Sequence, residues 1–364
     1  MVRTYRYRLK DGNQRDKLKK LAGQVNFVWN FSNEIIRENW RRSRKYTSKN
    51  DLHVLTKGAS KELDVNSQTI QAVAYECLLR TQKAKKRVRF RTGRKNLGWI
   101  PFNGQTVKYC GDYITYNGFK FRLWEHRKLL AGADIKTGSF AEDSRGRWYL
   151  NLTIEVADEV AMLPLAPNQD IGIDPGTKTV LTTSDGEKFE RENLTRDYEE
   201  KLAKAQRHRK KRQAKSIHAK IKNKRQDRNH KASHSLAKRY KAIYFGDADS
   251  SRLAQTRMAK GVLDAGWYQI FTFLQYKSLR RGGIVLKVSE KFSTVTCSSC
   301  LTRCGPSGLS GLSIREWTCQ SCGAVHDRDI NSAIYILRSG RGTLREEAVS
   351  FSPKGSADYN AISV

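Results

Sequence analysis

Two cysteine pairs stand at the spacing of a metal site. Each pair is a Cys-x-x-Cys turn, and a short polar, Gly-rich loop separates the two turns. Zn²⁺ binds four thiolates in a tetrahedron, and two such turns supply them. We therefore predict one structural zinc ion, bound by Cys297, Cys300, Cys319 and Cys322.

Carboxylates flank this predicted zinc ribbon. Glu290 stands just before it, and Asp327 and Asp329 stand just after it. The ribbon therefore has the position of an insertion between two pieces of one acidic site. Asp327 has a second interpretation, as the N-cap of the helix that follows.

A further acid, Asp174, lies in the sequence GIDPG. A short apolar strand delivers this residue, Gly176 permits a tight turn, and the segment 180–183 pairs back. An Asp at the tip of a first strand, followed by a hairpin, is how RNase H-like nucleases start. The simpler alternative is a capping Asp in an ordinary hairpin.

A cluster of such acids suits one kind of chemistry. Hydrolysis of a phosphodiester by water requires an activated nucleophile and relief of the charge on the leaving oxygen. Two Mg²⁺ ions about 3.5–4 Å apart supply both, and Mg²⁺ prefers hard oxygen ligands. Carboxylates without a metal repel one another, so their clustering indicates function.

The composition points to a polyanionic partner. The chain has 364 residues, and 69 Lys and Arg stand against 36 Asp and Glu, a formal net charge of +33. This excess opposes a compact fold unless a polyanion neutralises it, so nucleic acid is the expected partner. A membrane surface is the other polyanion, but we find neither a membrane-length apolar run nor a signal peptide.

The cysteines indicate a reducing compartment rather than a disulfide framework, because four of the seven belong to the ribbon. We expect Cys77 and Cys110 to be buried thiols. Cys304 is a spare that has the wrong spacing for the metal site.

The first part of the chain predicts strands around helices. Residues 2–9 alternate between polar and apolar, which predicts a strand with one basic face. From 96 to 156 the pattern is β throughout, and Asn117-Gly118 is a strong signal for a type I′ hairpin. We predict one small β-barrel that includes the first strand, with the helices of 11–95 inserted.

The second part predicts an α/β domain after a linker at Pro164 and Pro167. Residues 197–240 are the most basic segment and predict a long helical hairpin that orders best against phosphates. The apolar runs 242–245 and 284–288 predict strands of a parallel sheet, with one amphipathic helix between them. The fold class is therefore α+β with several domains.

Six features together form a recognisable set: GIDPG, the basic helical stretch, LDAGW, FSTVTCSSC, CQSCG and HDRDINSA. The chain resembles the TnpB family, transposon-encoded RNA-guided DNA nucleases related to type V CRISPR effectors and to eukaryotic Fanzor proteins. The likeness extends to about Leu337. It implies a wedge β-barrel (1–10 and 96–165), a helical recognition domain (11–95), an RNase H-like RuvC nuclease domain (166–294 and 324–340, with the basic hairpin 197–240), a zinc ribbon (295–323) and a disordered tail (341–364).

The family motifs place catalytic aspartates at Asp174 and Asp329. A glutamate usually stands at the strand tip that Gly246 occupies here. In Fanzors and some TnpB relatives the glutamate sits on a later strand, and Glu290 matches that place. Tips of parallel neighbouring strands lie about 4.8 Å apart, which a Glu side chain can largely cover. We therefore expect Asp174, Glu290 and Asp329 to be catalytic and to bind two Mg²⁺ ions; a dead site is the alternative.

Two other acids follow the empty strand tip, but we do not expect either of them to bind metal. Asp247 should point to the opposite face of the extended chain from Gly246, and Asp249 lies in the turn beyond.

The resemblance also implies a guide RNA (the omega RNA) and double-stranded target DNA as partners, in the cytoplasm of a prokaryotic cell and associated with the nucleoid. Three functions remain open: an RNA-guided nuclease, a nuclease-dead RNA-guided repressor, and a plain zinc-ribbon nucleic-acid-binding or transposition accessory protein. Basic side chains are expected to contact phosphates, although a solvated helix end is the simpler alternative. They are Lys83, Lys85, Lys86, Arg87, Arg207, Arg209, Lys210, Lys211, Arg212, Lys220, Lys222, Lys224 and Arg225.

Overall fold

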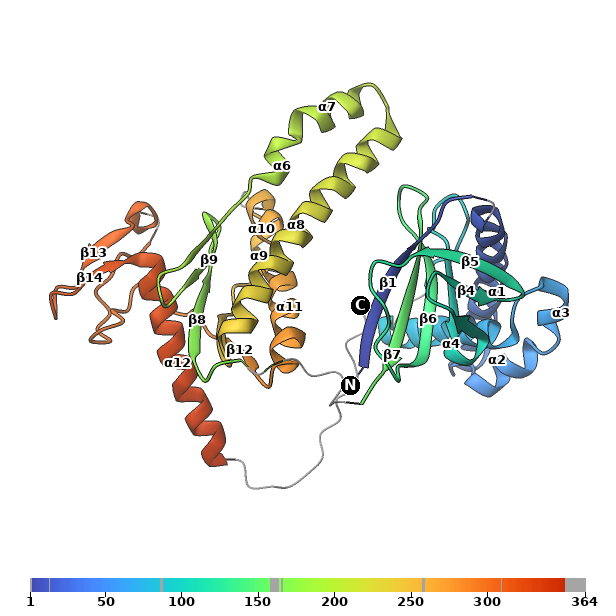
Figure 1. The fold of residues 1–364 in the computed structure, drawn as a ribbon, viewed down its shortest axis with the longest axis horizontal. Coiled ribbons are helices and arrows are strands. Elements are labelled where there is room, and N and C mark those ends of the chain that lie inside the picture. The colour runs from blue at the N-terminus through green and yellow to red at the C-terminus, as the bar shows by residue number, and fades with distance from the viewer. Residues whose placement is uncertain are drawn as a thin grey trace. The chain divides into compact units, whose positions relative to one another are not determined.

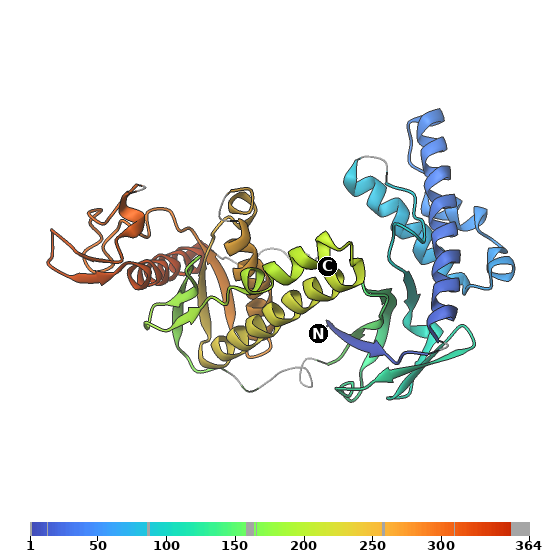
Figure 2. The same ribbon diagram turned by 90° about the horizontal axis from the view of Figure 1, so that it is seen from above.

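Two separate β-sheets organise the chain, and each has its own helices (Figures 1 and 2). The computed structural model describes residues 2–12, 14–85, 88–157, 164, 166–256, 259–308 and 310–350. The chain divides into two units, Met1–Ala161 and Met162–Val364. Among the described residues, no helix combines the length and the apolar character needed to cross a membrane.

The sheet of the first unit has seven antiparallel strands in the order β2-β6-β7-β1-β5-β4-β3. The first strand joins this sheet as predicted, and it pairs with β7 and β5. The order ends at β2 and β3, and no described ladder joins these two, so the paired strands do not form the closed ring of a barrel. The strands are β1 (Val2–Leu9), β2 (Trp99–Asn103), β3 (Val107–Tyr109), β4 (Tyr113–Tyr116), β5 (Phe119–Trp124), β6 (Asp134–Glu142) and β7 (Trp148–Glu155).

The alternation in β1 explains its place in the sheet, because Tyr5, Tyr7 and Leu9 are buried while Arg6 is exposed. The predicted hairpin is also confirmed. Asn117 and Gly118 both have positive φ, 50° and 75°, as a type I′ turn requires, and β4 and β5 pair on either side of them.

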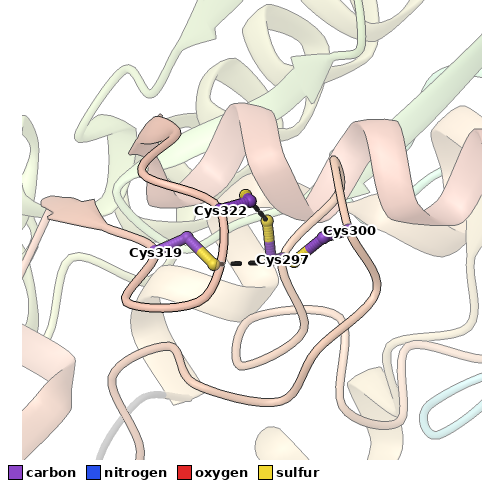
Figure 3. A group of neighbouring side chains, drawn as sticks. All are labelled: Cys297, Cys300, Cys319 and Cys322. Carbon is purple, nitrogen blue, oxygen red and sulfur yellow. Dashed lines mark hydrogen bonds between the residues drawn. The ribbon is translucent and has the colours of Figure 1, made fainter.

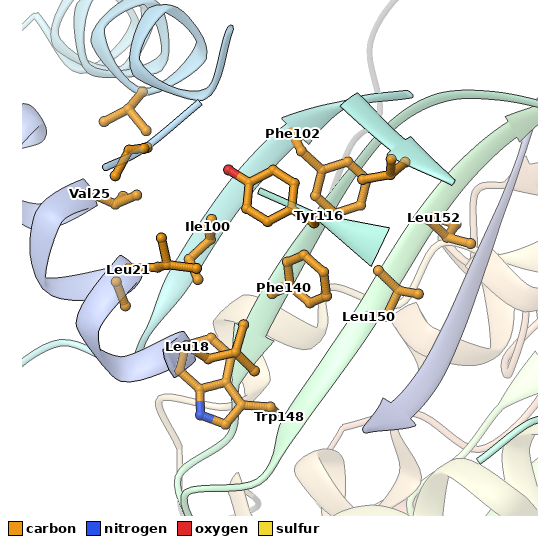
Figure 4. Close-up of a cluster of buried hydrophobic side chains, with 14 of the residues drawn as sticks. Leu18, Leu21, Val25, Ile100, Phe102, Tyr116, Phe140, Trp148, Leu150 and Leu152 are labelled. Carbon is orange, nitrogen blue, oxygen red and sulfur yellow. The ribbon is translucent and has the colours of Figure 1, made fainter. Parts of the chain in front are cut away.

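Helices α1 (Gln14–Ser43), α2 (Lys49–Leu55), α3 (Ala59–Leu63) and α4 (Ser67–Ala84) lie between β1 and β2 in sequence. The apolar stripe of α1 packs on the sheet, and Leu18, Leu21 and Val25 share one core with Ile100 and Phe140 (Figure 4).

The two cysteines predicted as buried thiols differ from each other. Cys77 is buried in the core of the first unit, and burial raises its pKa to about 12. Cys110 is exposed, so that prediction was wrong. It lies in the turn between β3 and β4 rather than on a strand of the sheet.

The sheet of the second unit has the order β10-β9-β8-β11-β12. Its strands are β8 (Asp170–Pro175), β9 (Thr179–Thr183), β10 (Lys188–Glu190), β11 (Ala242–Gly246) and β12 (Ile284–Val288). The first three form an antiparallel meander, whereas β8, β11 and β12 run parallel. The carboxyl ends of the parallel strands therefore meet at one edge. β12 is the outer strand and most of its side chains are not buried, so its apolar run does not mark a central strand.

Helices cover both faces of this sheet. One core joins the sheet to α8 (Lys211–Arg239), α10 (Ala259–Ala265) and α11 (Trp267–Leu279), and another joins it to α12 (Arg328–Ser350). α12 comes so close that a Cβ on Gly172 would lie 2.1 Å from the carbonyl oxygen of Ala333. A Cβ on Gly340 would lie 2.1 Å from the ring of Tyr244.

Two predicted segments differ in the structure. The single helix expected between β11 and β12 is broken into α9 (Ser250–Leu253), α10 and α11, and Gly266, with φ of 67°, separates the last two. The tail predicted from residue 341 starts too early, because α12 continues to Ser350; residues 351–364 lie outside the described part.

α6 (Leu194–Asp197) leads into the basic segment, which forms the predicted helical hairpin of α7 (Glu199–Arg207) and α8. α7 and the first half of α8 extend beyond the sheet (Figures 1 and 2). Between β12 and α12 lies the cysteine-containing insertion, which has a hairpin of β13 (Glu316–Thr318) and β14 (Val325–Asp327).

Candidate functional site

The four predicted zinc ligands converge in the insertion. Their sulfur atoms all lie within 4.8 Å of one another, and they are the one such set of three or more candidate ligands among the described residues. Figure 3 shows the four side chains pointing toward a common centre. The sulfurs of Cys297 and Cys322 are 3.8 Å apart, and those of Cys300 and Cys319 are 3.6 Å apart. A tetrahedron with Zn–S bonds of about 2.3 Å has edges of about 3.8 Å, so the cluster fits zinc.

Two side chains that were not predicted as ligands stand beside this cluster. His326 places Nε2 3.0 Å from Cys297 Sγ, and its ring packs on Trp317. Cys304 places its sulfur 3.2 Å from Cys319 Sγ but does not belong to the converging set of four. A ring nitrogen that bonds a thiolate sulfur is typical of the groups that orient metal ligands.

Asp174 is the last residue but one of β8, at the edge where the parallel strands finish. Ser332 Oγ donates a hydrogen bond to its Oδ1 over 2.9 Å. Burial raises the pKa of Asp174 to about 7, and the charge of Asp329 acts in the same direction, although the bond from Ser332 and the charge of Arg328 oppose it. A carboxylate in this position is costly without a cation nearby.

The side chain of Glu290 fills the space at the empty strand tip. A Cβ atom on Gly246 would lie 2.1 Å from Glu290 Oε1 and 2.8 Å from Pro175 Cδ. The Oε1 atom is buried and has no hydrogen-bond partner among the described residues. Burial raises the pKa of Glu290 to about 8, and the charges of Asp174 and Asp247 add to this effect. An orphaned buried oxygen of this kind fits a site for a cation.

Asp329 lies in the first turn of α12 and forms an ion pair with Arg315, whose Nη1 is 3.2 Å from Oδ1. Its charge acts on Asp174. The three predicted carboxylates nevertheless do not reach the 4.8 Å convergence that the cysteines show, at least among the described residues.

The other nearby acids have structural partners. Asp327 Oδ1 accepts from the backbone N–H groups of Asp329 and Ile330, and its Oδ2 is 2.6 Å from Lys188 Nζ, so it caps α12. The contacts of Asp327 are therefore those of an N-cap, which was its second interpretation.

The two acids after the strand tip are also engaged. Asp247 accepts from the backbone N–H of Glu290 over 2.9 Å, and Asp249 caps α9 through the N–H of Arg252.

The predicted phosphate-contacting side chains fall on two surfaces, one in each unit. Most of the described ones are exposed, and Arg225 is the exception because its guanidinium donates to the carbonyl of Leu263. Lys220 and Lys224 both lie against the ring of Tyr198, at 5.5 and 5.7 Å from its centre. Lys86 and Arg87 lie outside the described residues.

Sequence reasoning missed the role of the LDAGW motif. Asp264 accepts from the N–H and the hydroxyl of Thr195, at 3.0 and 2.6 Å, at the start of α6. The indole of Trp267 donates to the carbonyl of Gly176 over 3.2 Å. The motif lies at the junction of α10 and α11. It holds two segments there: the start of α6, which leads into the basic hairpin, and the turn after Asp174. Its unusual Gly-Trp pair was the available signal.

Comparison with known proteins finds several that are similar to this chain. Residues 267–336 match the family model described as Cas12f1-like, TNB domain. The chain is 34% identical to a candidate RNA-guided DNA endonuclease of Streptomyces pristinaespiralis, over 59% of this chain and 55% of that protein. It is 26% identical to the candidate RNA-guided DNA endonuclease InsQ of Escherichia coli K12, over 94% of this chain and 93% of that protein. A TnpB-like protein, L79 of Acanthamoeba polyphaga mimivirus, is 28% identical over 34% of this chain. The chain is therefore similar to RNA-guided DNA endonucleases and TnpB-like proteins.

The matches differ in extent. The chain spans about half the length of the Streptomyces relative and nearly all of the E. coli relative. Among solved structures, Cas12f1 in a complex with sgRNA and target DNA matches 92% of this chain with a TM-score of 0.59 and 11% identity. At that identity the match establishes a shared fold, which in this chain carries both the sheet with Asp174 and the cysteine insertion.

Proposed function

We propose that this protein is an RNA-guided DNA endonuclease of the TnpB family that cleaves its target beside a short flanking motif. The main support for this proposal is the position of Glu290. Its carboxylate occupies the space at the tip of β11, where the family usually has a glutamate. The names of the Streptomyces and E. coli relatives support the same activity.

Asp174, Glu290 and Asp329 would hold two Mg²⁺ ions. Carboxylate oxygens are the ligands that Mg²⁺ prefers, and the buried, unpartnered Oε1 of Glu290 together with the raised pKa values of Glu290 and Asp174 fits such a cation site. Mg²⁺ bound there would activate water and relieve the charge on the leaving oxygen.

The protein's own residues prepare this site. Asp174 lies on β8 and Glu290 follows β12, the two strands that flank β11 in one sheet, and Asp329 is carried by the helix that packs on that sheet. Arg315 neutralises Asp329 in the structure. We expect it to give up this pairing when the three carboxylates close on metal.

Guide RNA and target DNA would supply the polyanion that the net charge of +33 requires. In RNA-guided recognition base pairing reads the target sequence, and the protein holds the nucleic acid mainly through its backbone. The exposed Lys and Arg side chains of α7 and α8 suit this role.

Removing these charges should flatten the salt dependence of RNA binding. Replacing Lys211, Arg212, Lys220 and Lys222 with Gln should reduce the slope of log K against log salt concentration by about 0.7–0.9 for each phosphate that the protein no longer neutralises. Filter binding from low to high salt measures this slope. A control variant of equal charge change replaces four lysines that are exposed in the first unit: Lys19, Lys20, Lys57 and Lys61. An unchanged slope in the first variant would mean that this part of the hairpin is merely solvated.

The proposal as a whole is tested on the purified protein. Sequencing of co-purified RNA should identify one defined species, and the resulting complex should cleave DNA that matches the guide when Mg²⁺ is present. A complex that binds its guided target but never cuts it would be a nuclease-dead repressor. A protein that carries no defined RNA would be a plain nucleic-acid-binding protein.

A further inference from the structure

A pair of buried hydroxyl groups lies between the three segments that carry the acids. Ser332 Oγ donates to Asp174 and is also 2.7 Å from Ser293 Oγ. The backbone N–H of Ser293 donates to the carbonyl of Glu290 over 3.0 Å. Ser332 itself lies near the start of α12, three positions after Asp329. The two serines therefore contact every segment that bears a proposed metal ligand.

Asn331 extends these contacts to the cysteine cluster. Its Oδ1 accepts from the N–H of Ser298, directly after Cys297, over 2.7 Å. Its Nδ2 donates to the carbonyls of Thr296 and Ser293, at 2.8 and 3.3 Å. The amide uses its acceptor and both donors, so only one orientation of the side chain satisfies all three bonds.

These three residues are buried. Ser293 is 3% exposed, Asn331 1% and Ser332 0%. A buried polar network whose members all have partners fixes one arrangement of the segments around it, since any shift leaves a polar group unpaired. The network is short, and it connects backbone groups of the first cysteine turn to the side chain of Asp174.

We propose that Ser293, Asn331 and Ser332 form a positioning network that holds the three carboxylates in register with one another and with the cysteine cluster. This inference rests on the proposed function, because it concerns the geometry of the same acidic site. The three residues hold the ligand-bearing segments and contact no substrate. Outer-shell partners of this kind change metal affinity or activity by about 10- to 100-fold when they are lost.

The first measurement is the Mg²⁺ dependence of cleavage by the guide-RNA complex. Ser332→Ala should raise the Mg²⁺ concentration for half-maximal rate by about 10-fold or more, with target binding unchanged. Ser293→Ala should act in the same direction. Ser278→Ala is the matched control, because Ser278 is also 0% exposed but its hydroxyl has no hydrogen-bond partner among the described residues. It should leave the Mg²⁺ dependence unchanged.

Two further measurements do not depend on DNA cleavage. Fe²⁺ with ascorbate cuts the polypeptide close to bound metal, and the unmutated complex should be cut near Asp174, Glu290 and Asp329. Ser332→Ala should weaken all three cuts. Asn331→Ala should speed the release of zinc to a chelator by about 10-fold or more. Asn331→Asp keeps the acceptor for Ser298 but loses the donors. Its rate of zinc release should therefore fall between those of the unmutated protein and Asn331→Ala.

The outcomes separate the inference from the function on which it rests. If the unmutated complex neither cleaves DNA nor shows the iron-induced cuts, the proposed nuclease fails, and the zinc-release rate of Asn331→Ala still decides whether the network holds the ribbon. If the unmutated complex is active and Ser332→Ala matches it, or if Ser278→Ala is equally impaired, the network is not a positioning device. Unchanged zinc release in Asn331→Ala would also overturn the inference.

Discussion

Replacing Glu290 with Gln is expected to abolish Mg²⁺-dependent cleavage while RNA and target binding remain intact. Gln keeps the size of the side chain beside Gly246 but removes the charge from an oxygen that is buried without a partner among the described residues. The cleavage rate should fall by more than the effect of losing an outer-shell partner, which is about 10- to 100-fold, because a direct ligand is removed. Asp174→Asn and Asp329→Asn should lose cleavage in the same way as Glu290→Gln. Single-turnover cleavage at saturating Mg²⁺, with target binding measured in parallel, tests this.

Two variants provide controls for the position of the carboxylate. Asp247→Asn keeps an oxygen that can accept from the N–H of Glu290, so it should cleave nearly normally. Gly246→Glu combined with Glu290→Gly returns the carboxylate to the tip of β11 and should recover part of the activity that Glu290→Gln loses. If Asp247→Asn stops cleavage and Glu290→Gln does not, the ligand has been placed on the wrong residue.

Replacing Cys319 and Cys322 together with Ser should remove zinc from the protein and unfold the insertion. The bound metal contributes about 10–16 kcal/mol in structural sites of this type, which the small β13–β14 hairpin cannot supply alone. Elemental analysis should fall from about one zinc per chain to none, and the thermal transition of the protein should move to lower temperature.

Cys304→Ser is the matched control for this pair. Its sulfur is close to that of Cys319 but does not belong to the converging four, so this variant should keep its zinc. Zinc retained by the double variant would contradict the site, and zinc lost from Cys304→Ser would mean that the ligand set includes Cys304.

Local signals allowed a good part of the fold to be predicted. The Asn117-Gly118 turn follows from backbone geometry that few residue types tolerate, and the two Cys-x-x-Cys turns follow from the coordination of the metal. The location of Asp174 at a strand tip was predictable because an apolar run ends there. Each of these features depends on a few residues that are adjacent in the sequence.

Other features depend on contacts that sequence spacing does not record. The apolar run of β12 indicated a strand of a parallel sheet, but it did not record that this strand lies at the edge, where pairing on one side decides its exposure. The contact between Glu290 and Gly246 could be expected from the strand order alone, yet its closeness depends on the rotamer of one side chain. The ion pair of Asp329 with Arg315 had no local signal at all.

The close packing of α12 on the sheet limits which substitutions this sequence can accept. At Gly172 a methyl group would lie 2.1 Å from the Ala333 carbonyl oxygen, and at Gly340 it would lie 2.1 Å from the Tyr244 ring. A substitution at either position requires the helix or its neighbour to shift and so disturbs the packing of the helix that carries Asp329. Gly342, on the same helix, has no neighbour within 4 Å of its would-be Cβ and is open to change. Relatives that keep the acidic site should therefore keep small residues at the first two positions, whereas the third should vary freely.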